Sequence, residues 1–335
     1  MKKGYKVAVV GATGLVGQEI IRILEQRRFP VEELRPIASD ESVGLLTEFG
    51  GREWKVLPLN PDTLRGVDFV LSSAGATVSK RFVPWIKGKH TVVIDNTSAF
   101  RMDPDVPLVV PEVNPDQAFQ HKGLIANPNC STIQLVVVLN EIHKKWGLKR
   151  VVVSTYQSVS GKGKDAMEEL SRQTMALFNQ RPFDVVTFPH QIAFNLLPHI
   201  DSFMADGYTK EEVKVINETR KIMDLPDLKI TCTAVRVPTF ACHGETVNIE
   251  TQSSFDLEQV RSVLNEADGV QVIDNPKDDE YPMPITAADT DPVYVGRIRR
   301  DNSVDNGLNL WIVADNIRKG AALNSVQIAE LLISN

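Results

Sequence analysis

VAVVGATGLVG, residues 7–17, sets the architecture of the first part of the chain. Val7–Val10 form a compact apolar strand, and Gln18–Arg27, after the glycines, has the pattern of a helix. Glycines at positions 11, 14 and 17 allow a tight turn and a close approach of the backbone to a pyrophosphate at the helix N-terminus. The spacing differs from G-x-G-x-x-G, so an ordinary glycine-rich turn is the alternative. We predict a nucleotide-binding strand–turn–helix unit.

The same alternation continues outward from this stretch. Leu34–Ala38, Phe69–Ser72 and Val92–Ile94 read as short strands, and each ends in small or polar residues. Strands that alternate with helices predict βαβ units around a parallel sheet.

The pattern changes after residue 130. We expect helices at 164–178 and 210–223, with Val213, Ile216 and Ile222 as the inward positions of the second. Strands are expected at 151–156, 230–237, 246–251, 293–298 and 308–314. Several strands in succession predict a mostly antiparallel sheet, which suits dimerisation. An apolar-periodic helix at 321–333 is placed to return to the first domain.

These patterns predict an α/β chain of two domains. The first is a dinucleotide-binding domain over 1–129, completed by the C-terminal helix of 318–335. The second, over 130–317, is an α+β domain that carries the catalytic and dimerisation surfaces.

Composition narrows the function classes. The 335 residues carry a formal net charge of -6 without a basic tail or stripe, which argues against nucleic acid. No stretch approaches the roughly 20 apolar residues that span a bilayer, and the N-terminal apolar run is too short for a signal peptide. The three cysteines have no metal-ligand spacing, so we expect no metal and no disulfide framework. A cytoplasmic protein is therefore expected.

Cys130 stands in Asn127-Pro128-Asn129-Cys130-Ser131-Thr132, directly before an apolar run of helical length. Pro128 and its flanking asparagines break any preceding helix, so the sulfur is expected at a helix N-terminus. Unpaired N–H groups there favour the thiolate, which can attack a carbonyl carbon. The alternative is a small buried apolar residue, the commonest fate of a cysteine outside disulfides.

The end of the second strand should contact the adenosine ribose of a bound dinucleotide. It reads Ser39-Asp40-Glu41-Ser42. An acidic residue suits the 2′-hydroxyl of NAD, whereas the 2′-phosphate of NADP prefers an arginine or a hydroxyl group. Both cofactors remain open on these residues alone, and a solvated loop is the further alternative.

Four motifs together closely resemble the aspartate-semialdehyde dehydrogenase family. They are the glycine loop at 11–17, Asn127 to Thr132, Gln157-Ser158-Val159-Ser160-Gly161, and Arg236-Val237-Pro238-Thr239 followed by His243-Gly244-Glu245. The resemblance runs from about residue 5 to 330. It implies a Rossmann-like first domain and the NADP-dependent reduction of 4-phospho-L-aspartate to L-aspartate 4-semialdehyde, with release of phosphate. That reaction serves lysine and diaminopimelate, methionine and threonine synthesis.

The resemblance also implies roles for individual residues. Cys130 is expected to be the nucleophile that forms a thioester, and Gln157 to orient the acyl group. His243 is expected to be the general acid/base, because the unperturbed pKa of histidine lies near neutrality. The substrate-binding residues implied are Arg236 for the carboxylate, Arg101 for the phosphate, Glu211 for the amine, Lys214 for the phosphate, and Asn129 at the anion site. Glu211 and Lys214 lie one turn apart, so they share a face of the predicted helix.

The cofactor-binding residues implied are Gly11, Thr13, Gly14, Leu15, Val16, Ser39, Ser72, Gly75, Ser160, Gly161 and Asn316. We expect NADP, with NAD as the alternative because of Asp40 and Glu41; many family members have arginine where this chain has Glu41. The expected partners are the small-molecule substrate, phosphate and a second copy of the chain in a homodimer, with a homotetramer as the alternative.

Two other functions compete with this interpretation. N-acetyl-γ-glutamyl-phosphate reductase has the same architecture, but it usually has glycine where this chain has Asn129, and it needs no site for a free amine. A non-catalytic paralogue would not need Cys130, Gln157, Arg236 and His243 together. Cys242, beside His243, is a rival nucleophile, but no helix is expected to start after it, so we expect a core residue.

Overall fold

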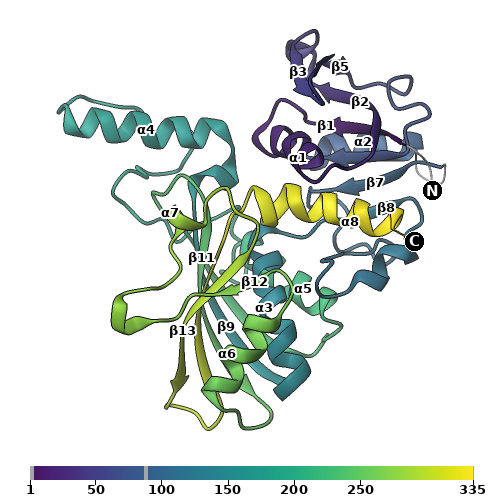
Figure 1. Cartoon of the computed structure of the whole chain (residues 1–335). Coiled ribbons are helices and arrows are strands. Elements are labelled where there is room, and N and C mark those ends of the chain that lie inside the picture. The colour runs from purple at the N-terminus through teal and green to yellow at the C-terminus, as the bar shows by residue number, and fades with distance from the viewer. Residues whose placement is uncertain (1–3, 87–89, 335) are drawn as a thin grey trace. The chain divides into compact units, whose positions relative to one another are not determined.

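The computed structural model describes residues 4–86 and 90–334 (Figure 1). The chain divides into two compact units, Met1–Asn129 with Ala321–Asn335, and Cys130–Gly320. The second unit thus extends past the expected boundary at 317, because a π-helical turn, Arg318–Ala322, carries the chain out of it.

The first unit is built on a parallel sheet with strand order β5-β2-β1-β6-β7-β8. Its strands are β1 (Tyr5–Val10), β2 (Val31–Ala38), β5 (Leu57–Pro58), β6 (Phe69–Ser72), β7 (Val92–Asp95) and β8 (Leu124–Ala126), beside a small hairpin of β3 (Leu46–Phe49) and β4 (Arg52–Lys55). Its helices are α1 (Leu15–Gln26), α2 (Ala76–Ile86) and α8 (Leu323–Ile333), with short 3-10 turns at Asp40–Ser42 and Pro115–Gln120. The predicted α/β architecture with a parallel sheet is confirmed.

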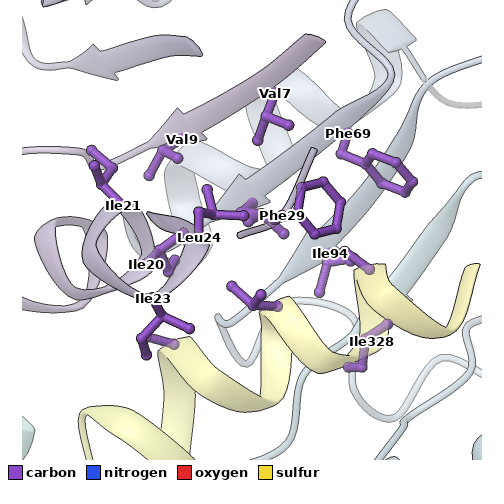
Figure 2. Close-up of a cluster of buried hydrophobic side chains, with 14 of the residues drawn as sticks. Val7, Val9, Ile20, Ile21, Ile23, Leu24, Phe29, Phe69, Ile94 and Ile328 are labelled. Carbon is purple, nitrogen blue, oxygen red and sulfur yellow. The ribbon is translucent and has the colours of Figure 1, made fainter. Parts of the chain in front are cut away.

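One apolar cluster holds this unit together. Figure 2 shows Val7 and Val9 of β1 facing Ile20 and Leu24 of α1, with Ile328 of α8 in the same cluster. These side chains are fully buried. Burial of a large aliphatic side chain contributes about 1.5–3 kcal/mol, so residues from both ends of the chain stabilise the same core.

The second unit contains a mixed sheet with strand order β10-β9-β11-β14-β13-β12. Its strands are β9 (Leu148–Gln157), β10 (Lys229–Arg236), β11 (His243–Thr251), β12 (Val270–Val272), β13 (Val293–Asp301) and β14 (Gly307–Ala314). The three central pairings are antiparallel and the two outer ones are parallel. The expected antiparallel character therefore holds for the centre of the sheet.

Helices α3 (Cys130–Trp146), α5 (Lys210–Ile222) and α6 (Leu257–Glu266) contact one another through α3 and pack on this sheet. Helix α4 (Lys164–Phe178) has the expected bounds and its own small apolar cluster. The remaining elements are α7 (Pro284–Ala287) and the 3-10 turns Val159–Lys162 and Pro276–Asp278.

The expected inward face of α5 is wrong at two positions. Val213 and Ile216 are half-buried, whereas Val215 and Ile222 are buried together with Glu212. The reason is that Glu212 accepts hydrogen bonds from Thr209 N at 2.7 Å and Ala234 N at 2.9 Å. Because this carboxylate caps the helix and bonds to the neighbouring strand, the face of α5 that packs on the sheet includes polar residues.

Candidate active site

Cys130 is the first residue of α3, as predicted, and its side chain is partly accessible. Gly320 lies directly against it, since a Cβ atom added to Gly320 would lie 2.8 Å from Cys130 Cβ. The thiol therefore stands at the positive end of a 17-residue helix, with bare backbone on one side.

Gln157, Arg236 and His243 lie at one level of the second sheet. The register pairs Gln157 with Arg236 on one side and with His243 on the other. All three side chains are buried. Gln157 and Arg236 are the last residues of β9 and β10, and His243 is the first of β11. Three of the expected site residues thus lie side by side at the same end of these neighbouring strands.

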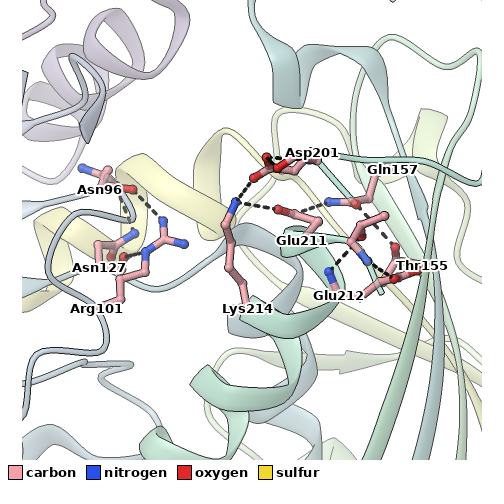
Figure 3. A network of polar contacts seen from close by, with 11 residues as sticks. Asn96, Arg101, Asn127, Thr155, Gln157, Asp201, Glu211, Glu212 and Lys214 are labelled. Carbon is pink, nitrogen blue, oxygen red and sulfur yellow. Dashed lines mark hydrogen bonds and ion pairs between the residues drawn. The ribbon is translucent and has the colours of Figure 1, made fainter. Parts of the chain in front are cut away.

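Helix α5 contributes a second charged group (Figure 3). Glu211 accepts hydrogen bonds from Gln157 Nε2 at 3.1 Å and from Lys214 Nζ at 3.2 Å. Lys214 also donates to Asp201 at 2.7 Å. Burial alone would lower the pKa of Lys214, but Glu211 and Asp201 outweigh it and raise the pKa, so the ammonium is retained. The predicted shared face of Glu211 and Lys214 is confirmed.

Arg236 links these groups electrostatically to the thiol. It is 6% exposed and donates to the Ser158 carbonyl oxygen at 2.7 Å. Burial lowers the pKa of its guanidinium, while the negative charges of Glu211 and of Cys130 raise it in turn. By reciprocity, the guanidinium favours the thiolate form of Cys130.

His243 departs from the expectation that its pKa lies near neutrality. The side chain is fully buried, and burial, together with the Arg236 charge, lowers its pKa to about 3. Ser158 donates its backbone N–H to Nδ1 at 3.2 Å. Because an amide N–H can only donate, this bond assigns the proton of the neutral ring to Nε2. Within the described residues, Nε2 has no hydrogen-bond partner.

Ser160, Gly161 and Asn316, three of the residues expected to bind the cofactor, lie around His243. Ser160 Oγ lies 2.9 Å from Ser158 Oγ, and Asn316 Nδ2 donates to Ser160 Oγ at 3.1 Å. A Cβ atom on Gly161 would lie 3.3 Å from His243 Nε2. Ser158 Oγ is itself 3.2 Å from His243 Nδ1, so the network ends on the imidazole.

The glycine loop of the first unit has the geometry of a phosphate cradle. Gly11 has φ 90°, a left-handed conformation that favours glycine, and a Cβ atom on Gly17 would lie 2.0 Å from the Gly11 carbonyl oxygen. Thr13 and Gly14 are exposed just before α1 begins at Leu15, and Val16 is half-buried. The exposed backbone at a helix N-terminus therefore fits a pyrophosphate.

The loop after β2 lies beside this turn. Thr13 Oγ1 is 3.4 Å from Ser42 Oγ, and Ser39, Asp40 and Glu41 are exposed. Hydroxyl and carboxylate groups are thus both available where the sequence predicts the ribose.

The other expected residues of the first unit differ in accessibility. Ser72 is fully buried, with its hydroxyl 3.3 Å from that of Ser79, whereas Gly75 faces open space just before α2. Arg101 is buried and donates to the carbonyl oxygens of Asn127 at 2.9 Å and Asn96 at 2.7 Å (Figure 3). Asn129, also buried, precedes Cys130 in the chain.

The other cysteines are buried. Burial raises the pKa of Cys242 strongly, and Asp315 and Asp289 add to the effect, so this thiol is a poor nucleophile. Cys232 is likewise buried with a raised pKa. Across residues 4–86 and 90–334, no group of three His, Cys, Asp or Glu side chains is placed to hold a metal ion. Within the same ranges, no helix is long and apolar enough to cross a membrane.

Known proteins match this chain over nearly its full length. The NAD-binding domain of semialdehyde dehydrogenases matches residues 6–121, and the dimerisation domain of the same enzymes matches residues 139–319. A protein of Aquifex aeolicus named aspartate-semialdehyde dehydrogenase is 55% identical, with 98% of each chain covered. The chain belongs to the aspartate-semialdehyde dehydrogenase family. It is therefore an oxidoreductase.

Solved structures agree with this assignment. Aspartate semialdehyde dehydrogenase II of Vibrio cholerae, in a complex titled as containing ASA, is 45% identical with a TM-score of 0.96, covering 100% of this chain and 99% of that one. The enzyme of Candida albicans, described with NADP, is 25% identical with a TM-score of 0.77 and covers 98% of each chain. A nicotinamide cofactor and an oligomer follow for the family.

Three residues that the structure places in or beside this site were not singled out from the sequence. Ser158 bonds to His243, Gly320 abuts Cys130, and Glu245 is buried two residues beyond His243. Ser158 and Glu245 stand inside the quoted motifs, and this proximity was the available signal. Gly320 had no signal, because its neighbour is 190 positions away in the chain.

Proposed function

We propose that this chain catalyses the reversible, NADP-dependent reductive dephosphorylation of 4-phospho-L-aspartate to L-aspartate 4-semialdehyde, through a thioester on Cys130. The reaction would serve lysine and diaminopimelate, methionine and threonine synthesis in the cytoplasm. The observation that carries the proposal is the position of Cys130, at the N-terminus of α3 and in the field of the buried Arg236. Such a thiol is activated for attack on an acyl carbon.

The charges around the thiol match those of the substrate. Arg236 would bind the α-carboxylate through its guanidinium, and Glu211 would bind the ammonium. Arg101, Lys214 and Asn129 would bind the phosphate. Lys214 now bonds to two carboxylates and Arg101 to two carbonyl groups. An ammonium has three N–H donors and a guanidinium has five, so both side chains suit a phosphate.

The chain's own residues would act as follows. The Cys130 thiolate adds to the acyl carbon, the bond to the phosphate oxygen breaks, and the phosphate leaves with the electron pair. A bound nicotinamide supplies the hydride in this direction and accepts it in the other. Gln157 holds the acyl oxygen. His243, whose neutral ring carries its proton on Nε2, would stabilise the oxyanion that hydride addition forms by donating a hydrogen bond to it. The oxyanion then re-forms the carbonyl group as the carbon–sulfur bond breaks, and the Cys130 thiolate leaves with the electron pair.

The glycine loop fits a dinucleotide, with Gly11, Thr13, Gly14, Leu15 and Val16 around the pyrophosphate. Ser39, with Ser42 and Thr13 behind it, would bind the 2′-phosphate of NADP, while Asp40 and Glu41 would favour NAD. Ser72, Gly75, Ser160, Gly161 and Asn316 complete the proposed cofactor site. Because Ser72 is fully buried, its part would be structural, through the hydrogen bond to Ser79.

The test follows cofactor reduction by absorbance, with L-aspartate β-semialdehyde and either NADP⁺ or NAD⁺, with and without phosphate. Phosphate-dependent reduction of NADP⁺ is expected. Cys130→Ala should lower kcat by about a thousandfold or more, since loss of a nucleophile removes the covalent route. Cys242→Ala is the matched control at a buried thiol. Turnover of N-acetyl-glutamate semialdehyde alone, or an unchanged rate in Cys130→Ala, would overturn the proposal.

A further inference from the structure

Glu245 is a buried acid to which no step above gives a role. Its side chain is fully buried, and in the described parts of the chain neither carboxyl oxygen has a hydrogen-bond partner. It lies two residues after His243 on β11, so both side chains point to the same face of the sheet. An ionised carboxylate with no partner is strongly disfavoured in such a place, which favours the neutral acid.

The surrounding charges agree with a neutral Glu245. Burial raises its pKa well above the usual value and outweighs the side chain of Gln134, which lowers it. Glu245, Glu212 and Glu211 all lie close enough to Cys232 to affect its pKa, so the three acids lie near one thiol. Glu211 and Glu212 accept hydrogen bonds, from Gln157 and from backbone N–H groups respectively. Glu245 is therefore the member of this group that retains its proton.

Gln134 is the neighbour that can use this proton. It is buried on α3, one turn after Cys130, so the two side chains share a face of the helix. Its Nε2 donates to the His243 carbonyl oxygen at 3.4 Å, and its Oε1 has no hydrogen-bond partner among the described residues. Its amide N–H also lies close enough to the Glu245 carboxyl group to lower the pKa of that acid, although burial outweighs this effect. The Oε1 atom of Gln134 thus lacks a donor, and the protonated carboxyl group of the neighbouring Glu245 lacks an acceptor, among the described residues.

We propose that Glu245 is a protonated positioning residue, which donates its carboxyl proton to Gln134 and thereby holds the start of α3 against the start of β11. The pair fixes the spacing between Cys130 and His243, the first residues of those two elements. This inference rests on the proposed roles of Cys130 and His243. Glu245 itself does not touch the substrate.

Kinetics and stability of three variants test the proposal. Glu245→Leu leaves Gln134 without its donor, so we expect the Tm to fall by about 3–10 °C. The kcat should fall about 10- to 100-fold, because the two reacting groups lose their spacing. Glu245→Gln, which is neutral and can donate, should rescue both. Glu245→Leu/Gln134→Leu removes both polar partners, so it should recover the Tm but not kcat.

Infrared spectroscopy at neutral pH tests the proton directly. The wild-type protein should show the carbonyl stretch of a buried, protonated carboxylic acid, and Glu245→Gln should lack it. Glu169→Gln is the matched control at another buried acid. Burial raises the pKa of Glu169, but the N–H groups of Thr187 and Val186 outweigh it and lower the pKa, so this variant should keep the band.

Three results would overturn the proposal. They are the absence of the acid band in the wild type, a loss of activity in Glu245→Gln as large as in Glu245→Leu, and recovery of kcat together with Tm in the double variant. The last would reduce Glu245 to a packing role. A failure of the proposed function would look different. The wild-type protein would then show no turnover, while the infrared band and the Tm differences between variants would still be as predicted here.

Discussion

His243 is the residue whose chemistry departs most from its type. Its pKa falls from 6.5 to about 3 because the ring is fully buried beside Arg236. Between these values the unfolded chain binds a proton that the folded chain does not, so stability is lost as the pH falls through 6.5. We predict that the unfolding free energy, measured with urea, loses about 1–2 kcal/mol between pH 6.5 and 5 that His243→Gln does not lose.

His190→Gln, at an exposed histidine, controls for the removal of one imidazole. Equal pH slopes in the wild type and in His243→Gln would mean that burial and the charge of Arg236 do not keep the folded ring neutral.

Glu41 is the residue that we expect to decide between NADP and NAD. Its carboxylate is exposed in the 3-10 turn after β2, beside the hydroxyl groups of Ser42 and Thr13. We predict that Glu41→Arg raises the ratio of kcat/KM for NADP⁺ over NAD⁺ by about tenfold or more, since repulsion of a phosphate becomes a charge-assisted hydrogen bond. Glu48→Arg, at an exposed position of β3, is the matched control. An unchanged ratio in Glu41→Arg would place the 2′-group elsewhere.

The sequence predicts individual site residues where the chemistry is local. The helix start at Cys130 follows from the Asn-Pro-Asn before it and the apolar run after it, and the structure has both. The state of His243 does not follow from local sequence, because it depends on Ser158 and Arg236, which tertiary pairing brings to it. Glu245 is hidden for the same reason, since a glutamate in a strand is usually exposed.

At the scale of elements, the π-helical turn Arg318–Ala322 shapes the thiol site. Glycine in a helix usually costs about 0.5–1 kcal/mol relative to alanine, so Gly320→Ala would ordinarily stabilise the protein. Here the new methyl group would lie 2.8 Å from Cys130 Cβ and 3.3 Å from Cys130 Cα. We predict that Gly320→Ala lowers kcat about tenfold or more, because about 1 Å of displacement at a nucleophile is enough.

Alkylation of Cys130 by iodoacetamide gives a second measurement for Gly320→Ala, because its rate reports the thiol itself. The rate should change in parallel with kcat, while buried Cys242 stays unmodified. Wild-type kcat and alkylation in a more stable variant would show that Gly320 only occupies a helical position.

The sequence predicted the type of each element better than it predicted which strands pair with one another. Strand β6 and helix α4 have the expected bounds, because each is a short, strongly patterned segment between breakers. The order of the second sheet was not predictable, since β9 lies between β10 and β11 through pairings about 80–100 residues apart in the chain. The predicted inward face of α5 was wrong because Glu212 and Glu211 form hydrogen bonds with residues of the sheet, and hydrophobic periodicity cannot reveal such bonds.

At the scale of the whole molecule, exposed apolar side chains indicate where a second copy of the chain would bind. The family's dimerisation domain matches residues 139–319, and this range contains large apolar side chains that remain exposed. Phe178, at the end of α4, is 77% exposed and Phe194 is 68% exposed, and their rings make an edge contact at 5.7 Å. Leu196 and Phe203 are also exposed. Such a cluster in one segment is typical of a surface covered by a partner.

We predict that the oligomer is a homodimer and that its interface buries this cluster. Phe178→Asp with Phe194→Asp should raise the dimer dissociation constant by about a hundredfold or more, because two aromatic anchors are replaced by like charges on both copies of a two-fold interface. Sedimentation across a dilution series measures it. Ile285→Asp is the matched control, since Ile285 is 84% exposed but belongs to α7 and not to the segment of Phe178 and Phe194. A dimer as tight in the double variant as in the wild type would shift the interface to another part of this domain, such as the sheet around the half-buried Tyr156 and Trp311.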